Sequence, residues 1–258
     1  MDLFYREFGE AGNPQMVILH GLMGSSRNWQ AAAADLGAKY HVFCLDLRNH
    51  GESPHVAPHS YDGMAEDVLD WMASHSVTKP ILMGHSMGGK LAMKLACENP
   101  EKIGSLIVVD IAPKTYPNSH DTEYVAMRKV DMVSLKSRTE AARLLEEDID
   151  DWAMRQFLVT NIVRDKQTGG YRWQINLGEL ESNQRSIEAS SLEDGQCYLG
   201  EVMFVVGGMS AYFKDGDEPI VRKHFPKAEI KTIVESGHNP HFERREEFVS
   251  LVNEFVGP

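Results

Sequence analysis

Cysteine is scarce in this sequence. The 258 residues include three cysteines, Cys44, Cys97 and Cys197, and none of them forms a CxxC pair. Three scattered cysteines cannot build a disulfide framework, and their spacing does not match that of a zinc site. We therefore expect reduced, buried thiols, and the sequence predicts neither a metal ion nor an organic cofactor.

Long apolar runs and positive charge are also scarce. The opening residues MDLFYREFGEAG contain Asp2, Arg6 and Glu7 and resemble neither a signal peptide nor a membrane span. Lysine and arginine total 26 against 38 aspartates and glutamates, and the resulting net charge of −12 repels nucleic acid and anionic lipid. We therefore expect a cytoplasmic protein with no nucleic-acid or membrane partner. The sequence leaves the oligomeric state open.

The abundant features are those of an α/β protein with one substantial core. Hydrophobic residues make up 42% and charged residues 25% of a chain long enough to bury a large core. Apolar runs alternate with amphipathic helical stretches, which is typical of βαβ units and a mostly parallel sheet with helices on both faces. The expected strands are residues 15–20, 41–47, 80–86, 105–113, 201–208 and 229–236, and the expected helices are 25–40, 62–76, 87–100 and 244–256.

The segment from Lys114 to Leu192 interrupts this alternation. It contains helical stretches at 123–136 and 139–159, followed by a polar turn, RDKQTGGYRW, and no convincing buried strand. So long a segment is not a structureless loop in a compact domain, so we expect a helical insertion over one end of the sheet. The predicted division is a core domain of residues 1–113 and 193–258 and a helical cap of residues 114–192. We interpret the acidic run 146–151 as a solvated helix face rather than a metal site.

A sharp turn follows the strand that ends near His85. Residues 84–88, Gly-His-Ser-Met-Gly, fit the G-x-S-x-G pattern directly after an apolar strand and directly before a helix. Side chains at Gly84 and Gly88 would clash with neighbouring backbone, and the turn leaves the hydroxyl of Ser86 exposed at the carboxyl end of the sheet. The alternative role for Ser86 is that of a helix N-cap, which leaves the glycines unexplained. The pattern therefore predicts a serine nucleophile.

A serine nucleophile needs a base and donors for an oxyanion. His238 follows the last apolar strand near the C-terminus and is the predicted base, whereas the nearby His241 is expected to point elsewhere. The sequence His-Gly-Leu-Met-Gly follows the first strong strand, where a second oxyanion donor is expected. The predicted donors are the backbone N–H groups of Leu22 and Met87.

The acid that orients the histidine is harder to place. The strand before His238 ends in Met209 and Ser210, where an aspartate would be expected. Asp110 instead ends the apolar strand that follows the nucleophile helix, and a carboxylate there needs a partner. We assign the acid to Asp110, with Asp215 and Asp217 as alternatives. Asp110 as a backbone cap for the insertion is the structural alternative.

These motifs together resemble the α/β-hydrolase superfamily over nearly the whole chain. The segments HGLMGSSRNW, LDLRNHGES, GHSMGGKLAM, VVDIAP and VVGGMSAY are similar to one branch in particular, the small YbfF-type esterases. In that branch the acid lies at the DIAP position, which matches Asp110. The resemblance implies that residues 46–53 form a structural loop beside the site, with Arg48 and Asn49 at the edge of the pocket. Asn239 departs from the large aromatic residue that many members of the branch have after the histidine.

The sequence predicts a serine esterase with the triad Ser86, Asp110 and His238. The expected substrates are small to medium carboxylic esters, cleaved through an acyl-enzyme intermediate. The alternatives are an acyl thioesterase with the same triad and a non-catalytic protein that binds a ligand in the same pocket. Five residues of the insertion either wall the pocket or pack inside the cap: Met127, Met132, Trp152, Phe157 and Leu158.

Overall fold

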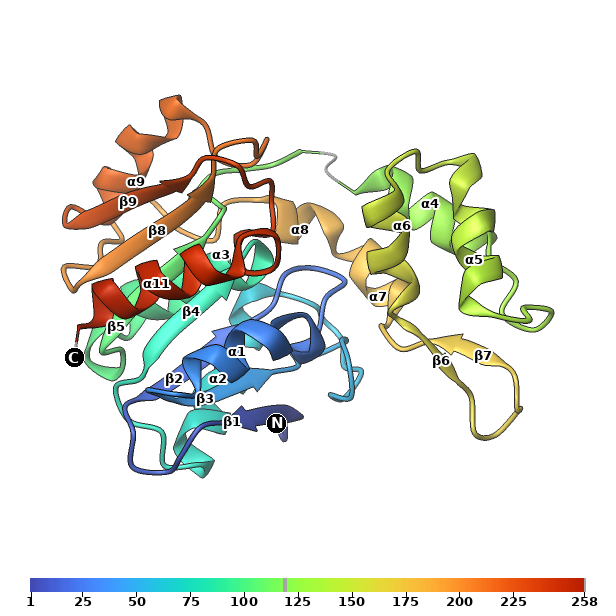
Figure 1. Ribbon diagram of the computed structural model, residues 1–258, viewed down its shortest axis with the longest axis horizontal. Helices are drawn as coiled ribbons and strands as arrows, with labels where there is room; N and C mark the ends of the chain where they lie inside the picture. The colour runs from blue at the N-terminus through green and yellow to red at the C-terminus, as the bar shows by residue number, and fades with distance from the viewer. Residues whose placement is uncertain (118–119, 258) are drawn as a thin grey trace.

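A twisted seven-stranded sheet forms the centre of the protein (Figure 1). The computed structural model describes residues 1–117 and 120–257. The strand order is β1-β3-β2-β4-β5-β8-β9, and only β1 runs antiparallel to its neighbour. The strands are β1 (Tyr5–Phe8), β2 (Gln15–Leu19), β3 (His41–Leu45), β4 (Ile81–His85), β5 (Ser105–Val109), β8 (Val202–Gly207) and β9 (Ala228–Ile233). This confirms the predicted α/β fold with a mostly parallel sheet.

Helices cover both faces of the sheet. The apolar cluster on one face includes α1 (Gln30–Leu36) and α11 (Arg245–Val256), and the cluster on the other includes α2 (Tyr61–Ser74), α3 (Met87–Glu98) and α9 (Glu218–His224). In β2, Met16 and Ile18 contribute to the first cluster, whereas Val17 and Leu19 contribute to the second. Successive side chains of a strand point to opposite faces, so strands buried on both faces are apolar throughout.

Short helical turns connect several of these elements. The 3-10 turns of the core are η1 (Ser26–Trp29), η2 (Pro100–Lys102) and η4 (Asp215–Asp217), and the four-residue helix α10 (Pro240–Glu243) precedes α11. The expected helix 87–100 is present as α3, which ends at Glu98, two residues earlier than expected, and Pro100 begins η2. Within the described ranges, no helix is both long and apolar enough to cross a bilayer.

The described residues between Lys114 and Leu192, here called the inserted segment, contribute most of a third apolar cluster, from Tyr124 to Leu180. Figure 1 shows α4 to α7 on one side of the core, with the β6–β7 hairpin projecting beyond them. Leu145, Leu158 and Leu180 are fully buried in this cluster, which also takes in Met23 from the core. Its elements are α4 (Asp121–Lys129), α5 (Arg138–Leu144), η3 (Leu145–Glu147), α6 (Trp152–Val159), β6 (Ile162–Arg164), β7 (Tyr171–Trp173), α7 (Leu177–Ser182) and α8 (Gln184–Glu188). The hairpin lies where the sequence predicts only a polar turn.

The acidic run of the inserted segment serves local structure. Asp148 pairs with Lys129, and Glu146 pairs with the guanidinium group of Arg155. The Asp151 carboxylate accepts hydrogen bonds from the first backbone N–H groups of α6 and so caps that helix. The run is therefore solvated, as interpreted, but it lies in a 3-10 turn and the loop after it and not on a helix face.

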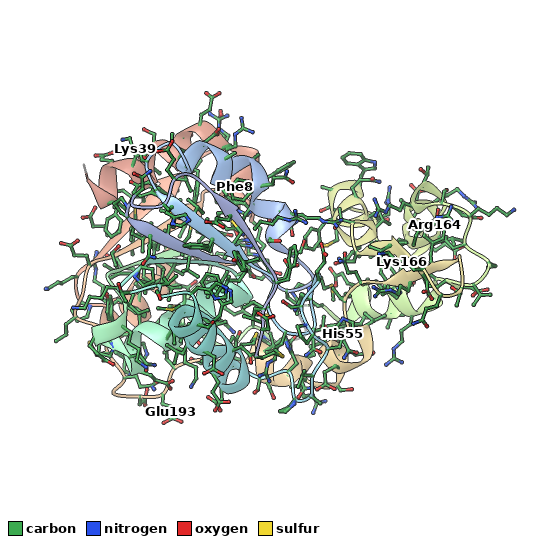
Figure 2. The ribbon with its side chains drawn as sticks, turned by 90° about the horizontal axis from the view of Figure 1, so that it is seen from below. Phe8, Lys39, His55, Arg164, Lys166 and Glu193 are labelled. Carbon is green, nitrogen blue, oxygen red and sulfur yellow. The ribbon has the colours of Figure 1, made fainter. Side chains whose placement is uncertain are left out.

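The two connections between the inserted segment and the core lie side by side. The backbone N–H of Tyr116 donates to the carbonyl oxygen of Glu188 at 2.8 Å. Farther along the boundary, the ring of His55 lies 2.9 Å from the carbonyl oxygen of Gln174 and ties a core loop to the inserted segment. Figure 2 shows His55 near the boundary between the two parts and Arg164 on the far side of the inserted segment.

Candidate active site

Ser86 occupies a strained turn between β4 and α3. Its backbone angles, φ 52° and ψ −118°, lie in a region that side-chain-bearing residues rarely adopt. A Cβ atom at Gly84 would overlap the carbonyl of Gly88, and one at Gly88 would overlap that of Leu19. The side chain of Ser86 makes no capping hydrogen bond to α3, a helix that is described in full. The N-cap alternative is therefore wrong, and the glycines have the steric role that the sequence analysis gives them.

Asp110 follows β5 and contacts the predicted base. Its carboxylate oxygen Oδ2 lies 2.7 Å from Nδ1 of His238, and its side chain is fully buried. The backbone N–H of Gly207 donates to the other oxygen at 2.8 Å, and the hydroxyl of Ser210 donates to Oδ2. These donors stabilise a buried carboxylate that would otherwise be costly. The structure thus brings Asp110 and His238 together, and Ser210 supplies a hydrogen bond that sequence reasoning missed.

The alternative acids and the alternative base lie elsewhere. Both carboxylate oxygens of Asp217 are 2.6 Å from Nζ of Lys114. Asp215 lies in the same 3-10 turn as Asp217. His241 is buried and stacks on Trp29 with a ring separation of 3.9 Å, and burial lowers the pKa of His241 to about 3. The ring of His241 is therefore a neutral part of the core.

Ser86 lies beside this pair. Its backbone N–H donates to the carbonyl of Val109 at 3.1 Å, which places it next to Asp110 across two neighbouring strands. His85 reaches the carbonyl oxygen of His238 through Nε2 at 2.8 Å. The Ser86 hydroxyl has no hydrogen-bond partner among residues 1–117 and 120–257. Among the described residues, no hydrogen bond joins the Ser86 hydroxyl to His238 in this geometry.

The residues that carry the predicted oxyanion donors line the same cavity. Met87 is the first residue of α3, so its N–H has no partner within the helix. Leu22 and Met87 both line the cavity that contains Ser86. A Cβ atom at Gly21 would lie 3.3 Å from Cβ of Ser86, which shows how closely the loop after β2 approaches the turn.

Buried histidines hold that loop. The N–H of Met23 donates to Nε2 of His50 at 3.1 Å, and the N–H of Leu47 donates to Nε2 of His20 at 3.0 Å. Desolvation lowers the pKa of both His20 and His50, which favours the neutral rings that can accept these bonds. His20 and His50 are thus structural residues that position the backbone around Leu22.

Two expectations about the pocket edge are wrong. Arg48 is buried and pairs with Asp67 at 2.5 Å, and the Asn49 side chain bonds to the backbone of Val56. Both side chains therefore hold the structural loop and do not reach the pocket.

The cavity at Ser86 is small, with a volume of about 30 Å³. Its lining residues are Leu22, Tyr61, Ser86, Met87, Lys90, Ile111, Tyr116, His120, Ile187, Glu188 and Tyr212. None of the five residues expected to wall the pocket is among them. Met127 and Leu158 are fully buried in the inserted segment, whereas Trp152 is 66% exposed. The structure favours packing within the insertion. The polar lining was missed because its residues come from separate helices and loops, such as Tyr61 in α2 and Lys90 in α3, that only the folded chain brings together.

Comparison with known proteins agrees with this geometry. Residues 14–245 match the α/β-hydrolase fold family. The chain is 34% identical to the sn-1-specific diacylglycerol lipase of Mus musculus, over 96% of this chain and 82% of that protein. It is 28% identical to esterase YbfF of Escherichia coli K12, over 95% of this chain and 93% of that protein. Among solved structures, a marine microorganism esterase superposes with a TM-score of 0.94 at 36% identity, covering 98% of this chain and 99% of the other.

Proposed function

Because this chain belongs to the α/β-hydrolase family, we propose that it is a serine hydrolase that cleaves small to medium carboxylic esters through an acyl-enzyme intermediate. The observation that carries the proposal is the 2.7 Å contact between Asp110 and His238 next to the strained turn at Ser86. The names of the relatives, a lipase and two esterases, support an ester as the substrate.

Each residue of the site has one task in the proposed reaction. Because Nδ1 of His238 faces Asp110, Nε2 is the atom that takes the proton from the Ser86 hydroxyl as its oxygen attacks the ester carbonyl. The N–H groups of Leu22 and Met87 stabilise the negative charge that develops on the carbonyl oxygen. His238 then returns the proton to the leaving alcohol.

The second half of the cycle reuses the same groups. Water attacks the acyl-enzyme, and His238 takes its proton and returns it to Ser86 as the acid departs. Asp110 stabilises the imidazolium form of His238 in both halves, and Ser210 and Gly207 keep its carboxylate in place. None of these steps requires a metal ion or an organic cofactor.

The proposal extends to the two parts of the chain. In it, residues 1–113 and 193–258 form the catalytic core, and the inserted segment 114–192 is a cap over Ser86. Tyr116, His120, Ile187 and Glu188, which come from the inserted segment, line the cavity, and this supports the division. The expected partner is a small-molecule ester, and the cytoplasmic location remains a prediction.

Labelling with a fluorophosphonate probe tests the proposal. The probe should attach to Ser86, as mapped by mass spectrometry of peptides, and the Ser86→Ala variant should remain unlabelled. Parallel assays with a butanoate ester and the matching butanoyl thioester would separate the esterase from the thioesterase. A wild-type protein that takes no label and cleaves neither compound would favour the non-catalytic, ligand-binding alternative.

A further inference from the structure

Most polar side chains that line the Ser86 cavity are already engaged with the protein. The Lys90 ammonium group donates to three carbonyl oxygens at the end of α8, at 3.2, 2.9 and 2.7 Å. The Tyr61 hydroxyl donates to the carbonyl of Ile187, and the Tyr116 hydroxyl donates to Tyr212 and accepts from Ala112. These groups hold the cavity wall and have no donor left for a substrate.

His120 differs from these residues. Its ring lines the cavity, and its Nδ1 atom is buried without a hydrogen-bond partner among the described residues. The nearest carboxylate oxygen, Oε2 of Glu123, is 3.9 Å away, which is too far for a hydrogen bond. His120 precedes α4, yet its side chain makes no capping bond to that helix. A buried polar group without a partner is costly, and none of the described residues offsets that cost at Nδ1.

The ring of His120 carries both a donor and an acceptor. Burial lowers the pKa of His120 to about 4, so the neutral form, with one N–H group and one bare nitrogen, is present at pH 7. The cavity volume of about 30 Å³ is enough to hold a group of the size of a water molecule. A hydroxyl group therefore fits this space in both size and hydrogen-bonding capacity.

The position of His120 indicates which part of a substrate it meets. Tyr212 lines the cavity together with His120 and stacks on His238 with a ring separation of 3.9 Å. The charge of His238 also contributes to the lowered pKa of His120. In the proposed reaction the leaving alcohol takes its proton from His238, so the alcohol portion of the ester must lie on this side.

We propose that His120 is a specificity-determining residue that hydrogen-bonds a second oxygen on the alcohol portion of the substrate. The preferred substrates are then esters of diols and other polyhydric alcohols rather than esters of simple alkanols. This inference rests on the proposed serine hydrolase function and assigns a substrate class to the same site. A site that hydrogen-bonds a hydroxyl discriminates against an analogue that lacks it, because its own polar group is left unpaired.

Two esters of the same shape and the same acyl group test the inference. Propyl butanoate and 2-hydroxyethyl butanoate differ only in a terminal methyl or hydroxyl group, and both give the same acyl-enzyme. We expect the ratio of their kcat/KM values to favour the hydroxylated ester in the wild-type protein. His120→Phe should lower this ratio by roughly 5- to 10-fold, the effect of one hydrogen bond.

Two further variants separate recognition from a structural effect. His120→Gln keeps a donor and an acceptor and should retain part of the preference. Val125→Ala changes a residue of α4 that is 50% exposed and outside the cavity lining, so it should leave the ratio unchanged. An equal loss on both esters in His120→Phe, or an unchanged ratio, would overturn the inference.

The remaining outcomes are equally decisive. His120 could instead favour ethyl 3-hydroxybutanoate over ethyl butanoate and show no preference between 2-hydroxyethyl butanoate and propyl butanoate. That result would overturn the assignment to the alcohol portion. If the wild-type protein cleaves neither butanoate ester and takes no fluorophosphonate label, the proposed function fails and this inference fails with it. Cleavage with a ratio independent of His120 overturns the inference alone.

Discussion

At the scale of single residues, Ser86 stores backbone strain at the site of the proposed chemistry. Its φ of 52° and ψ of −118° are costly for a residue with a Cβ atom, at about 1–3 kcal/mol. Glycine adopts such angles without that penalty but loses more conformational entropy on folding. The strain therefore belongs to the backbone turn and not to the hydroxyl group.

Replacing Ser86 in two ways separates strain from chemistry. Both Ser86→Ala and Ser86→Gly should abolish turnover and fluorophosphonate labelling, because both lack the hydroxyl oxygen. Ser86→Ala should keep the wild-type free energy of unfolding, whereas Ser86→Gly should raise it by about 1 kcal/mol. Urea unfolding of the three proteins measures this difference. Equal stability of the two variants would contradict the presence of strain.

Asp110 is the second residue with a predicted effect. Asp110→Asn keeps the size of the side chain but favours the wrong tautomer of His238, so kcat should fall by about 10³- to 10⁴-fold with little change in KM. Asp217→Asn is the matched control, because the Asp217 carboxylate pairs with Lys114 and not with His238. Rates on a p-nitrophenyl ester decide between them. A large loss of kcat in Asp217→Asn, together with a near-normal kcat in Asp110→Asn, would identify Asp217 and not Asp110 as the acid.

Sequence reasoning reached some of these residues and missed others for a physical reason. Asp110 was predictable because a carboxylate at the end of an apolar strand needs a partner, and here its partner is His238. At Ser210 the sequence showed only that an expected aspartate is absent, and it did not predict the hydrogen bond to Asp110. His120 lies outside any strand or helix, so no periodicity marked it as a cavity residue. Contacts between distant loops depend on the folded path of the chain, which local patterns do not contain.

At the scale of elements, Lys90 joins α3 to the end of α8. Three carbonyl oxygens at a helix C-terminus receive its ammonium group, which suits the negative end of the helix dipole. Burial disfavours the charged form of Lys90 and lowers its pKa to about 7, whereas the negative charge of Glu188 raises the pKa. The lysine therefore connects the inserted segment to the core in a way that depends on pH.

The pH dependence of stability should reveal this connection. An unfolded lysine has a pKa near 10.4, so above pH 7 the unfolded chain holds a proton that the folded protein has released. The free energy of unfolding of the wild-type protein, minus that of Lys90→Met, should therefore rise by about 1 kcal/mol per pH unit from pH 7.5 to 9.5. Below pH 7 this difference should be flat. Urea unfolding at several pH values measures it.

Lys94→Met provides the control on the same helix. Burial lowers the pKa of Lys94, but its partners Asp62 and Glu98 outweigh burial and raise the pKa overall, so Lys94 keeps its proton in both states across this range. The corresponding difference for Lys94→Met should not change from pH 7.5 to 9.5. A rise of the same size for Lys94→Met, or none for Lys90→Met, would count against the pH-dependent connection.

Elements with strong periodicity were predictable, and short ones were not. The six expected strands match β2, β3, β4, β5, β8 and β9, because strands buried on both faces are apolar throughout. β1 is a half-buried edge strand with Arg6 and Glu7 at its centre, and β6 and β7 have three residues each. Such short or exposed strands lack a buried face to impose a pattern. Their existence depends on tertiary pairing.

At the scale of the whole molecule, the apolar interior is divided. The inserted segment has its own cluster, and its main apolar residue from the core is Met23. The sheet has separate clusters on its two faces. Local stability should therefore differ between the two parts.

Hydrogen exchange of a variant in the inserted segment tests this division. Leu180→Ala removes a fully buried side chain and should destabilise the segment by about 2–4 kcal/mol. Amides of α4, α6 and α7 should exchange faster, whereas those of β4 and β5 should keep wild-type protection. Leu106→Ala, in β5, is the comparison that should accelerate exchange throughout the core. Equal acceleration of both parts in Leu180→Ala would show that they unfold as one unit.

The paired connections at Tyr116 and Glu188 have a consequence for how this chain can be altered. The backbone leaves the sheet and returns to it at points joined by one hydrogen bond of 2.8 Å. Two chain ends that close can be bridged by a tight turn. A longer or exchanged segment between the two points should therefore leave the strands in place. We therefore expect exchange of this segment to change the range of substrates while the proposed nucleophile, acid and base keep their positions.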